Sequence, residues 1–589
     1  MVATNPMRSA MAVLSLILRL IQSLLRAIRW ASDRVGDAGV VGFVTNAGFL
    51  DANFADGLRK CLASEFSNIY VFHLRGNQYT SGELSRREGG KIFDSGSRAP
   101  IAISILVKSP RRDEQGKIFF HDIGDYLSRK EKLENIAAHG SIEGISSWSA
   151  IVPDEYGDWL EQRDESFSQY MPVSSKVKTD SAIFSVTSQG LITARDGWCY
   201  NASADSLAEN IEGFVCSYNG EVDRFDDKFK GLQKKARDAQ VDAFIELDSK
   251  KFNWSRSLKS RLAKGEKLSY ARDNIVPALY RPFSKQMIYF DSDLIEMISR
   301  NRVIFPRGSG ENRVICFSGP GCISGFSALI TSIPADFCVA AMKGGTPCLP
   351  LFVYEAPLQF GAPGKLFDDP ALEPNRSHGI SDLGLAHYQA AYSGEEISKE
   401  DLFYYVYGLF HSPDYRERFA DNLSKELPRI PAVKQAADFW AFSKAGRALA
   451  ELHLNYETVE QYPLTIEAKG KLTDADYRVE KMKFAKKKDP ETGKSVNDRR
   501  TVIYNGKITL KDIPEAAWDY VVNGKAALDW VMERQAVRTD KASGIVNDAN
   551  DWATETMGNP KYPLELFQRV VTVSLETQKI VNSLPPLDI

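Results

Sequence analysis

The order of apolar and polar positions in the first 110 residues predicts a small α/β unit. Apolar runs rich in β-branched residues are typical of buried strands, and three of them occur here, at 40–46, 68–74 and 101–107. Residues 51–66, between the first two, show helical periodicity. The second and third runs are joined by a polar loop, 75–98, without a helical pattern. A connection without a helix favours antiparallel neighbours, so we expect an antiparallel pair at the edge of an α/β sheet.

The N-terminal 32 residues contain no acidic residue, and 10–18 is an uncharged apolar run. This run is too short to span a bilayer, and no small-residue cleavage site follows it. Arg19, Gln22, Arg26 and Arg29 recur at steps of three and four and form one polar stripe. The pattern predicts an amphipathic helix that packs on a sheet, with no membrane association. Residues 1–20 fit it less well than residues 21–32, and residues 1–26 are expected to form an atypical N-terminal helix.

The rest of the chain shows mixed α and β patterns. Residues 178–350 are rich in aromatic residues and short apolar runs, and 355–380 is a connection rich in Pro and Gly. The tail contains the strand-like run TVIYNGKITL, a basic loop at 481–500 and a final helix that starts near YPLELF. Helical patterns precede the tail, at 398–418 and 432–452.

Composition restricts the class of protein more than its function. The chain has 589 residues, 43% hydrophobic and 26% charged, which are values of a globular protein with several domains. Its formal net charge of −3 means that any nucleic-acid surface must be a local patch. The seven cysteines are scattered without CxxC spacing, which indicates reduced thiols, a cytoplasmic location and no metal site.

Motifs of a self-contained enzyme are absent from the sequence. It has no GxxxxGK[ST] loop, no HExxH and no GxSxG, and no strand is followed by a glycine-rich dinucleotide-binding turn. The seven histidines are dispersed. The chemistry must therefore be sought in binding surfaces.

The loop 75–98 is the first candidate surface. It combines Arg86, Arg87, Gly89-Gly90 and a single large apolar residue, Phe93. Arginines and backbone amides bind phosphate, and a loop aromatic can stack on a base removed from the duplex. The alternative is that Phe93 caps the core beneath the strands and the arginines are solvated.

The second candidate is the aromatic and basic segment PALYRPFSKQMIYF, 277–290, followed by Arg300 and Arg302. Tyr280 and Arg281 suit contact with DNA, Arg281 by reading a base edge. They equally suit a buried core with cation–π pairs. The basic run 255–267, with Arg256 and Lys259, is a third candidate, against the alternative of a solvated face. Lys486–Lys488 and Arg499-Arg500 are weaker candidates at an expected hairpin tip.

Several blocks of the sequence together resemble one family. FVTNAGFLDANFADGLRKCLASEFSNIYVFHLRGN and SRREGGKIFDSGSRAPIAISILVK resemble the second half of the DNA adenine methyltransferase in type ISP restriction–modification proteins. HDIGDYLSRKEKL, ALYRPFSKQMIYFD, DLFYYVYGLFHSPDYRERF and NDWATETMGNPKYPLELFQRVVTVSLETQKIV are similar to the specificity region that follows it there. The resemblance runs from about residue 27 to the C-terminus.

The resemblance implies a fold and a domain order. The fold class is α/β, a partial Rossmann-like methyltransferase sheet followed by mixed α+β specificity domains. The expected parts follow the N-terminal helix of residues 1–26. They are half a methyltransferase domain at 27–165, a target-recognition domain at 166–354, a helical part at 355–454 and an α+β part at 455–589. Double-stranded DNA is the implied partner.

The same resemblance implies that this chain does not transfer methyl groups by itself. The methyl-donor loop of the family and its Asn/Asp/Ser-Pro-Pro-aromatic motif have no counterpart here, so we expect no cofactor, although the complete enzymes use S-adenosylmethionine. Phe93 matches an aromatic that forms one wall of the flipped-base pocket, on a mobile loop. We therefore expect a DNA sequence-recognition part of such an enzyme, with no catalytic residue of its own.

Two alternatives stay open from the sequence. In the first alternative, the chain is the complementing half of a split active methyltransferase, whose other chain supplies the donor-binding half, nuclease and ATPase. In the other alternative, the chain is a truncated remnant without function, as its unusual first 26 residues and its missing motifs suggest.

Overall fold

The computed structural model describes residues 25–80, 82–93, 98–110, 116–175, 181–306, 312–354, 375–490 and 493–589. The chain divides into two compact units. Unit 1 contains the chain up to Gln169 with Ile323–Gly325 and Arg418–Leu427, and unit 2 contains the remainder. Residues 25–32 are helical, as predicted, whereas most of the predicted N-terminal helix and of the Pro/Gly-rich connection lies outside the described residues.

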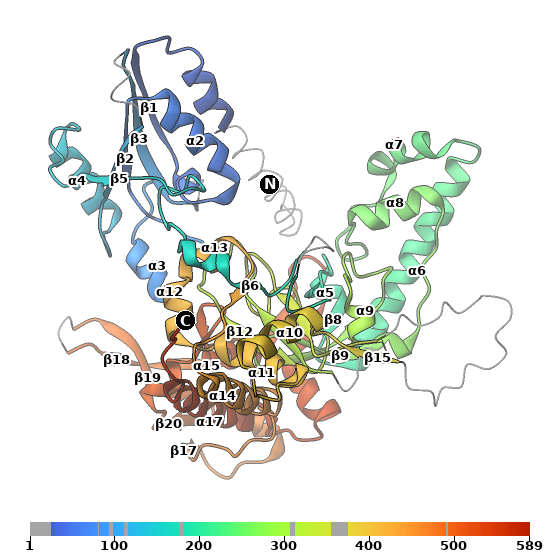
Figure 1. The fold of residues 1–589 in the computed structure, drawn as a ribbon. Coiled ribbons are helices and arrows are strands. Elements are labelled where there is room, and N and C mark those ends of the chain that lie inside the picture. The colour runs from blue at the N-terminus through green and yellow to red at the C-terminus, as the bar shows by residue number, and fades with distance from the viewer. Residues whose placement is uncertain are drawn as a thin grey trace. The chain divides into compact units, whose positions relative to one another are not determined.

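Unit 1 is built on a five-stranded sheet in the order β1-β3-β2-β4-β5 (Figure 1). β2 and β4 are parallel, and the other neighbours are antiparallel. The three strands expected from the apolar runs are present. The bounds of the five strands are β1 Gly39–Asn46, β2 Asn68–His73, β3 Ile101–Lys108, β4 Lys117–Asp122 and β5 Ser149–Ile151.

The antiparallel pairing of β2 and β3 is confirmed, with Asn68 opposite Val107. The expected position at the edge of the sheet is wrong, because β3 lies between β2 and β1, which pairs along its other side. Ile101, Ala102 and Leu106 are buried, as suits a strand with neighbours on both sides. The loop between β2 and β3 also contains a helix, α3 Gly82–Glu88, that the sequence pattern did not predict.

Two further helices and a buried ion-pair network complete unit 1. The helices are α2 Asp56–Glu65 and α4 Arg129–His139, to which the short α13 Ala420–Lys425 is added from a distant part of the chain. Arg59 on α2 and Asp158 are fully buried, with Nη2 and Oδ1 2.6 Å apart. Lys425 of α13 places its Nζ 3.0 Å from Oδ2 of the same carboxylate. One carboxylate thus ties three chain segments together, at the cost of burying three charges.

Unit 2 contains three larger sheets and several two-stranded ones. The orders are β8-β10-β9, β12-β11-β13-β7 and β17-β20-β19-β18, and the pairs are β14-β15, β16-β6, β21-β22 and β23-β24. Residues expected to form a basic loop at 481–500 instead form most of the paired strands β18 and β19, so that expectation is wrong. The strands are β6 Met171–Pro172, β7 Ser188–Gln189, β8 Tyr200–Asn201, β9 Ile275–Arg281, β10 Ser284–Tyr289, β11 Val314–Phe317, β12 Ala328–Thr331, β13 Pro347–Pro350, β14 Phe352–Tyr354, β15 Arg376–His378, β16 Arg429–Ile430, β17 Thr465–Ala468, β18 Lys483–Lys488, β19 Ser495–Ile503, β20 Ile508–Lys511, β21 Val521–Val522, β22 Lys525–Ala526, β23 Val537–Thr539 and β24 Val546–Asp548.

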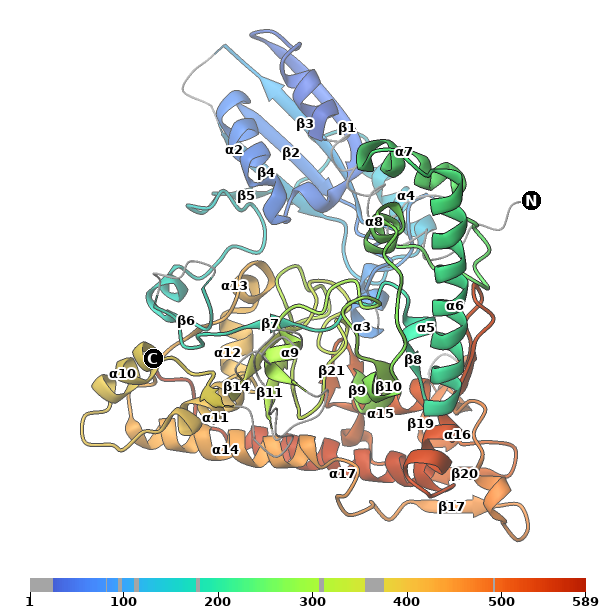
Figure 2. The same cartoon turned by 90° about the vertical axis from the view of Figure 1, so that its right-hand side faces the viewer.

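The helical patterns in the second half of the chain are confirmed. The long helices α14 and α17 lie side by side (Figures 1 and 2), and Nε2 of His453 is 2.9 Å from Oγ1 of Thr577 across them. The helices of unit 2 are α5 Asp196–Cys199, α6 Ala204–Lys228, α7 Lys234–Phe244, α8 Arg256–Lys264, α9 Asn301–Ile304, α10 Asp382–Ala391, α11 Lys399–Leu409, α12 Pro413–Arg418, α14 Ala436–Leu454, α15 Ala527–Arg534, α16 Ala549–Asp551 and α17 Tyr562–Asn582.

One hydrophobic core joins distant parts of unit 2. Leu279 and Val314 belong to the same buried cluster as Val502, Leu510 and Phe567. The expected target-recognition range, 166–354, and the expected C-terminal range, 455–589, thus pack on a common core. Where unit 2 divides into domains stays a prediction.

A helical arm, defined here as α6, α7 and α8, has a separate core. Phe214, Tyr218 and Phe225 on α6 pack with Leu258 and Leu262 on α8. Figure 2 shows α6 as a long helix with α7 and α8 packed towards one end of it. Within the part of the chain that the structure describes, no helix is both apolar and long enough to span a membrane, and no group of three or more possible ligands for a metal ion occurs.

Candidate nucleic-acid interface

The glycine pair before β3 packs against the start of α4. The amide of Gly90 donates to the carbonyl of Leu127 at 2.9 Å. A Cβ at Gly89 would lie 2.2 Å from that same carbonyl oxygen, and a Cβ at Gly90 would lie 2.5 Å from the amide nitrogen of Arg129. Only glycine permits this approach of two backbones, which fixes the loop immediately before Phe93.

The buried side chain of Lys132 also stabilises this turn. The ammonium of Lys132 on α4 donates to the carbonyl oxygens of Glu88 and Gly90, each at 2.8 Å. Burial is the main cause that lowers the pKa of Lys132, to about 8. The Glu88 side chain adds a third contact, since its Oε2 accepts from the amide of Asn77 at 2.9 Å. Sequence reasoning missed Lys132, because nothing local to it signals a contact with residues more than 40 positions away.

Phe93 follows this fixed turn and points out of the core. Ile92 is the buried residue, with 7% of its surface exposed, whereas Phe93 is 49% exposed. The interpretation of Phe93 as a cap on the core therefore does not describe the structure. The backbone up to Ile92 is also held by contacts, since Nε of Arg129 donates to the carbonyl of Ile92 at 2.8 Å. A half-exposed aromatic on an anchored loop is available to stack on a planar ligand.

Matched charges flank this loop. Arg75, which has a positive φ of 54°, places Nε 2.6 Å from Oδ1 of Asp122 and also pairs with Asp125. Burial by itself would raise the pKa of Asp122, but hydrogen bonds from His73, the Gly124 amide and Arg75 hold it at about 2. The carboxylate is therefore ionised at every physiological pH.

The two arginines predicted on this loop both lie on α3 and are exposed. Nε of Arg87 is 3.0 Å from Oδ2 of Asp125, so its charge is partly matched. Arg86 presents its side chain on the surface of the same last turn. Their predicted contact with DNA stays a prediction.

The second candidate segment forms the hairpin β9–β10, and its arginine is buried. Only 8% of the Arg281 side chain is exposed. Its guanidinium bonds to Asp336, lies 3.5 Å from Oδ2 of Asp196 and covers the Tyr280 ring at 4.0 Å. Burial by itself would lower the pKa of Arg281, but the Asp336 carboxylate raises it above its ordinary value. The alternative weighed from the sequence, a core with cation–π pairs, describes this geometry.

Tyr280 is enclosed by the same cluster. Its ring packs on Tyr200 with centroids 4.6 Å apart, and the guanidinium of Arg534 lies 5.5 Å from its centroid. Its hydroxyl is 3.4 Å from Oδ2 of Asp196. The cluster therefore supports the β9–β10 hairpin. No pattern in the sequence indicated Asp196, Asp336 or Arg534 as partners.

Arg300 and Arg302, the other two arginines of the second candidate, are exposed. Both side chains lie at the short helix α9, where Arg300 is the N-cap residue. Nη2 of Arg302 is 3.5 Å from the Ser292 hydroxyl. Neither arginine has an ion pair with any described residue, so their charge is available to an anion. Their predicted contact with DNA is compatible with this exposure and stays a prediction.

The basic run 255–267 forms α8 of the helical arm, and most of its charges are matched. Lys259 is 2.5 Å from Asp242, and Lys267 is 2.8 Å from Asp223. Arg261 is 2.9 Å from Asp293, and Lys264 is 3.4 Å from Glu266. Arg256 is exposed and has no ion pair among the residues that the structure describes. The arm therefore offers far less free positive charge than its sequence suggests.

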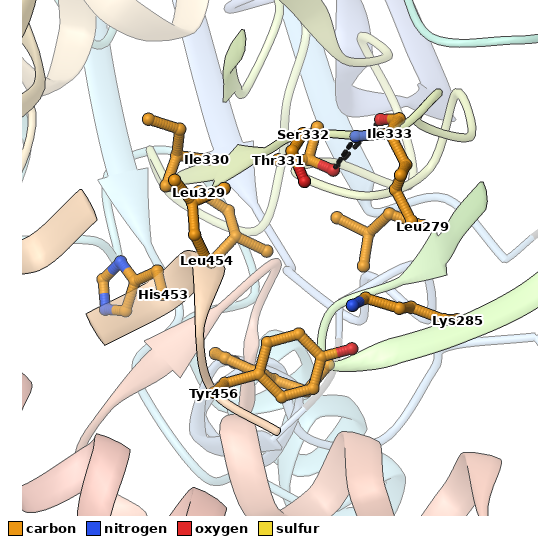
Figure 3. A pocket seen from close by; sticks show the side chains of 11 residues that line it. Leu279, Lys285, Leu329, Ile330, Thr331, Ser332, Ile333, His453, Leu454 and Tyr456 are labelled. Atoms are coloured by element: carbon orange, nitrogen blue, oxygen red, sulfur yellow. Dashed lines mark hydrogen bonds between the residues drawn. The ribbon is translucent and has the colours of Figure 1, made fainter. Parts of the chain in front are cut away.

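A small pocket of unit 2 lies between the β9–β10 hairpin, β12 and the end of α14 (Figure 3). Lys285 and Tyr456 face the same space, with Nζ of Lys285 5.3 Å from the ring centroid. Glu457 accepts from that ammonium at 2.6 Å. Because the Lys285 ammonium is already paired with Glu457, the pocket offers no unmatched positive charge to an anion.

The chain is similar to known proteins over most of its length. A family model described as the Type ISP C-terminal specificity domain matches residues 182–566. No curated protein matches the chain. Among solved structures, a nuclease-deletion mutant of the Type ISP restriction–modification enzyme LlaGI, in complex with a DNA substrate mimic, is 40% identical with a TM-score of 0.80. That comparison covers 96% of this chain and 48% of the chain of the deletion mutant.

Two further structures are similar over the same share of this chain. The ATP-dependent Type ISP enzyme LlaBIII bound to DNA is 32% identical with a TM-score of 0.80, and 34% of its chain is covered. A DrdV–DNA complex is 31% identical with a TM-score of 0.77, and 52% of its chain is covered. This chain thus spans about half or less of each of these proteins. The family model covers well over half of the chain, and the chain therefore belongs to the Type ISP restriction–modification family, of which it carries the C-terminal specificity domain.

Proposed function

We propose that this chain is the DNA sequence-recognition part of a Type ISP-like DNA adenine methyltransferase and does not transfer methyl groups alone. The observation that carries the proposal is the similarity of 96% of the chain, at a TM-score of 0.80, to LlaGI in complex with a DNA substrate mimic and to LlaBIII bound to DNA. Unit 1 corresponds to the second half of the methyltransferase, with a partial Rossmann-like sheet. Unit 2 recognises the target sequence.

In this proposal Phe93 stacks on the flipped base. Its exposure and the anchored Gly89-Gly90 turn support the role, because a rigid mount reduces the entropy lost when the ring orders against a base. Arg86 and Arg87, on the helix that precedes the turn, contact the backbone phosphates beside it.

We propose that the described residues of unit 1 do not form a site for S-adenosylmethionine. A donor site needs an open turn after a sheet strand, but the turn after β1 buries Ala47 and Phe49 in the core. The turn after β2 begins with Arg75, whose charge is committed to Asp122 and Asp125. In this proposal, the donor site and the catalytic motif are supplied by residues outside this sequence.

In unit 2, exposure separates the predicted contacts into two groups. Arg256, Arg300 and Arg302 are exposed and unpaired within the described residues, so they contact DNA directly. Lys259 contributes less, because Asp242 already neutralises it. Arg281 and Tyr280 have an indirect role, because they pack in the cluster that supports the β9–β10 hairpin. Base reading by Arg281 would require its release from Asp336, so we assign Arg281 to the support of the hairpin.

The first experiment is selection of duplexes from a random pool by the purified chain, at two salt concentrations, followed by sequencing. Enrichment of one asymmetric motif is the expected result. Weak binding that salt suppresses, with no motif, would contradict sequence recognition and leave only electrostatic attraction. Methylation of DNA by the chain alone with S-adenosylmethionine would contradict the second half of the proposal.

A second candidate function, the complementing half of a split active methyltransferase, is favoured by strand β1. Its outer edge pairs with no strand among the described residues. On one face of β1, Val40 and Val44 are 65% and 57% exposed. An open edge with an apolar face is suited to the remaining strands of a sheet, since such edges otherwise promote aggregation.

This candidate is tested by mixing the chain with a separately produced donor-binding half from a related enzyme. Concentration-dependent methylation, abolished when Val44→Lys places a charge on the β1 face, is the expected result for a split enzyme. Absence of a complex at high micromolar concentrations of both halves would exclude it.

A further inference from the structure

The hairpin of β18 and β19 carries a positive charge that has no role in the proposed function. Residues 483–503 contain seven lysines and arginines against three acidic residues, a net charge of +4. Lys483, Lys486, Lys488 and Arg499 are exposed and form no ion pair with a described residue. Lys487, 3.6 Å from Asp498, and Arg500, 3.8 Å from Asp512, have carboxylate partners within the hairpin and its sheet.

The ladder of the hairpin separates its lysines by face. Lys486 pairs with Asn497 and Lys488 with Ser495, so these four residues share one face. Lys487 pairs with Val496 and lies on the other face with Asp498, which stands opposite Ala485. The first face thus presents two ammonium groups with neutral hydrogen-bonding neighbours, and Nζ of Lys486 donates to Oδ1 of Asn497 at 2.6 Å.

The β-strand pairing is irregular at the base of the hairpin, where the backbone of Arg499 and Arg500 is held by hydrogen bonds. The pairing shifts between Phe484 and Ala485, so that residues 499–501 have no partner on β18. The carbonyl of Arg499 accepts from the indole N–H of Trp518 at 3.0 Å, and the carbonyl of Arg500 accepts from the amide of Ile513 at 3.2 Å. Bulges of this kind redirect side chains, and here the backbone that carries them is anchored to unit 2.

We propose that the β18–β19 hairpin is a second DNA contact, which binds the phosphate backbone and reads no base. This inference rests on the proposed function of the chain. Figure 1 shows the hairpin extending away from β17 and β20 of its own sheet, as a two-stranded ribbon. A narrow ribbon with unmatched ammonium groups on one face is suited to a polyanion. Contacts to phosphate add affinity and register but no sequence information.

The test compares two triple variants that remove the same charge. Lys483→Gln/Lys486→Gln/Lys488→Gln removes unmatched charge from the hairpin. Lys251→Gln/Lys264→Gln/Lys267→Gln removes matched charge from α8 and its flanking segments, since Lys251 lies 3.2 Å from Glu246. Kd for the selected duplex and for random duplex is measured over a range of salt. For the hairpin variant, we expect the slope of log K against log salt to fall by about 0.9 for each phosphate that is no longer neutralised, up to about 3 in total.

The expected pattern has three parts. The hairpin variant weakens binding to both duplexes by the same factor, the arm variant leaves the slope as in the wild type, and both keep the wild-type thermal unfolding. Equal slopes for the two variants would overturn the inference, since total charge alone would then act. A hairpin variant that loses preference for the selected duplex would contradict the absence of base reading.

Failure of the inference is distinguishable from failure of the proposed function. Wild-type chain that selects a motif while the hairpin variant keeps its full salt slope refutes only the hairpin. Wild-type chain without any duplex binding refutes the proposed function, and the hairpin contact with it.

Discussion

The helical arm and the β18–β19 hairpin contain two basic segments that look alike in sequence and differ in the folded chain. Residues 255–267 carry five basic residues and one acidic residue, so their net charge is +4, the same as that of residues 483–503. In the arm, carboxylates from α6, α7 and the segment after β10 neutralise most of this charge, among them Asp223, Asp242 and Asp293. In the hairpin, four of the seven basic side chains form no ion pair with a residue that the structure describes.

Matched charges and unmatched charges therefore have different roles in this molecule, in folding and in binding respectively. A matched pair holds segments of the fold together and is weakly attractive to a polyanion, because the local potential is close to neutral. Free charge contributes little to folding and is available to phosphate. Arg281 is the extreme of the matched class, buried between two aspartates, and the same division should separate effects on stability from effects on DNA binding.

The largest effect is expected for Arg281→Ala. The change leaves Asp336 buried without its cation, which should cost about 3–5 kcal/mol in the free energy of unfolding. Urea unfolding measures this, with Arg302→Ala on the exposed turn of α9 as a control that should change stability by less than about 0.5 kcal/mol. Unchanged stability with loss of binding to the selected duplex only would instead assign base reading to Arg281.

Phe93→Ala should reduce DNA binding without a loss of stability, because the ring is half exposed. Stacking on a displaced base is worth about 1–3 kcal/mol, and the gain should be greatest for a duplex with a mispaired target base, which leaves the helix more easily. Affinities for paired and mispaired duplexes are compared in the wild type, Phe93→Ala and Phe93→Trp. Phe93→Trp should keep the preference for the mispaired duplex. Equal preference in all three proteins would remove Phe93 from the interface.

A change at Asp122 tests whether the ion pairs beside the Phe93 loop contribute to the free energy of unfolding. Its pKa in the folded chain is about 2, below the ordinary value of 3.8, so its contribution is present above pH 4 and is lost as the pH falls through 2. The contribution should be about 2 kcal/mol. Urea unfolding at pH 7 should show this loss for Asp122→Asn. In the same variant, the free energy of unfolding should fall less between pH 4 and pH 2 than it does in the wild type. Asp227→Asn, an exposed change on α6, should do neither.

The smallest effect is expected when carboxylates that pair with lysines of the arm are removed, so that these lysines become unmatched like those of the hairpin. Asp242→Asn and Asp223→Asn free Lys259 and Lys267, with a loss of only about 0.2–1 kcal/mol for each exposed ion pair. If free charge near the DNA is what matters, the salt slope should steepen by at most about 0.9 for each freed lysine. No change in slope would place the arm away from the DNA and confine the comparison to the hairpin.

Local patterns in the sequence were enough to predict much of the secondary structure. Strands β1, β2 and β3, helices α2, α11 and α14, and the final helix α17 follow from period and apolar content, because these reflect contacts within a few residues. The similarity of several ordered blocks also identified the family, which the match over residues 182–566 confirms. The exposure of Phe93 agrees with its unusual place in a loop of polar residues.

Which charges are free depends on the tertiary structure. The central position of β3, the pairing of Arg281 with Asp336 and the pinning of Gly89-Gly90 by Lys132 each join residues far apart in the chain. No local pattern encodes these contacts, because they depend on how packed elements bring distant side chains within bonding distance. For the same physical reason, two segments of equal charge became a helix with mostly matched charges and a ribbon in which Lys483, Lys486 and Lys488 have no ion pair with a described residue.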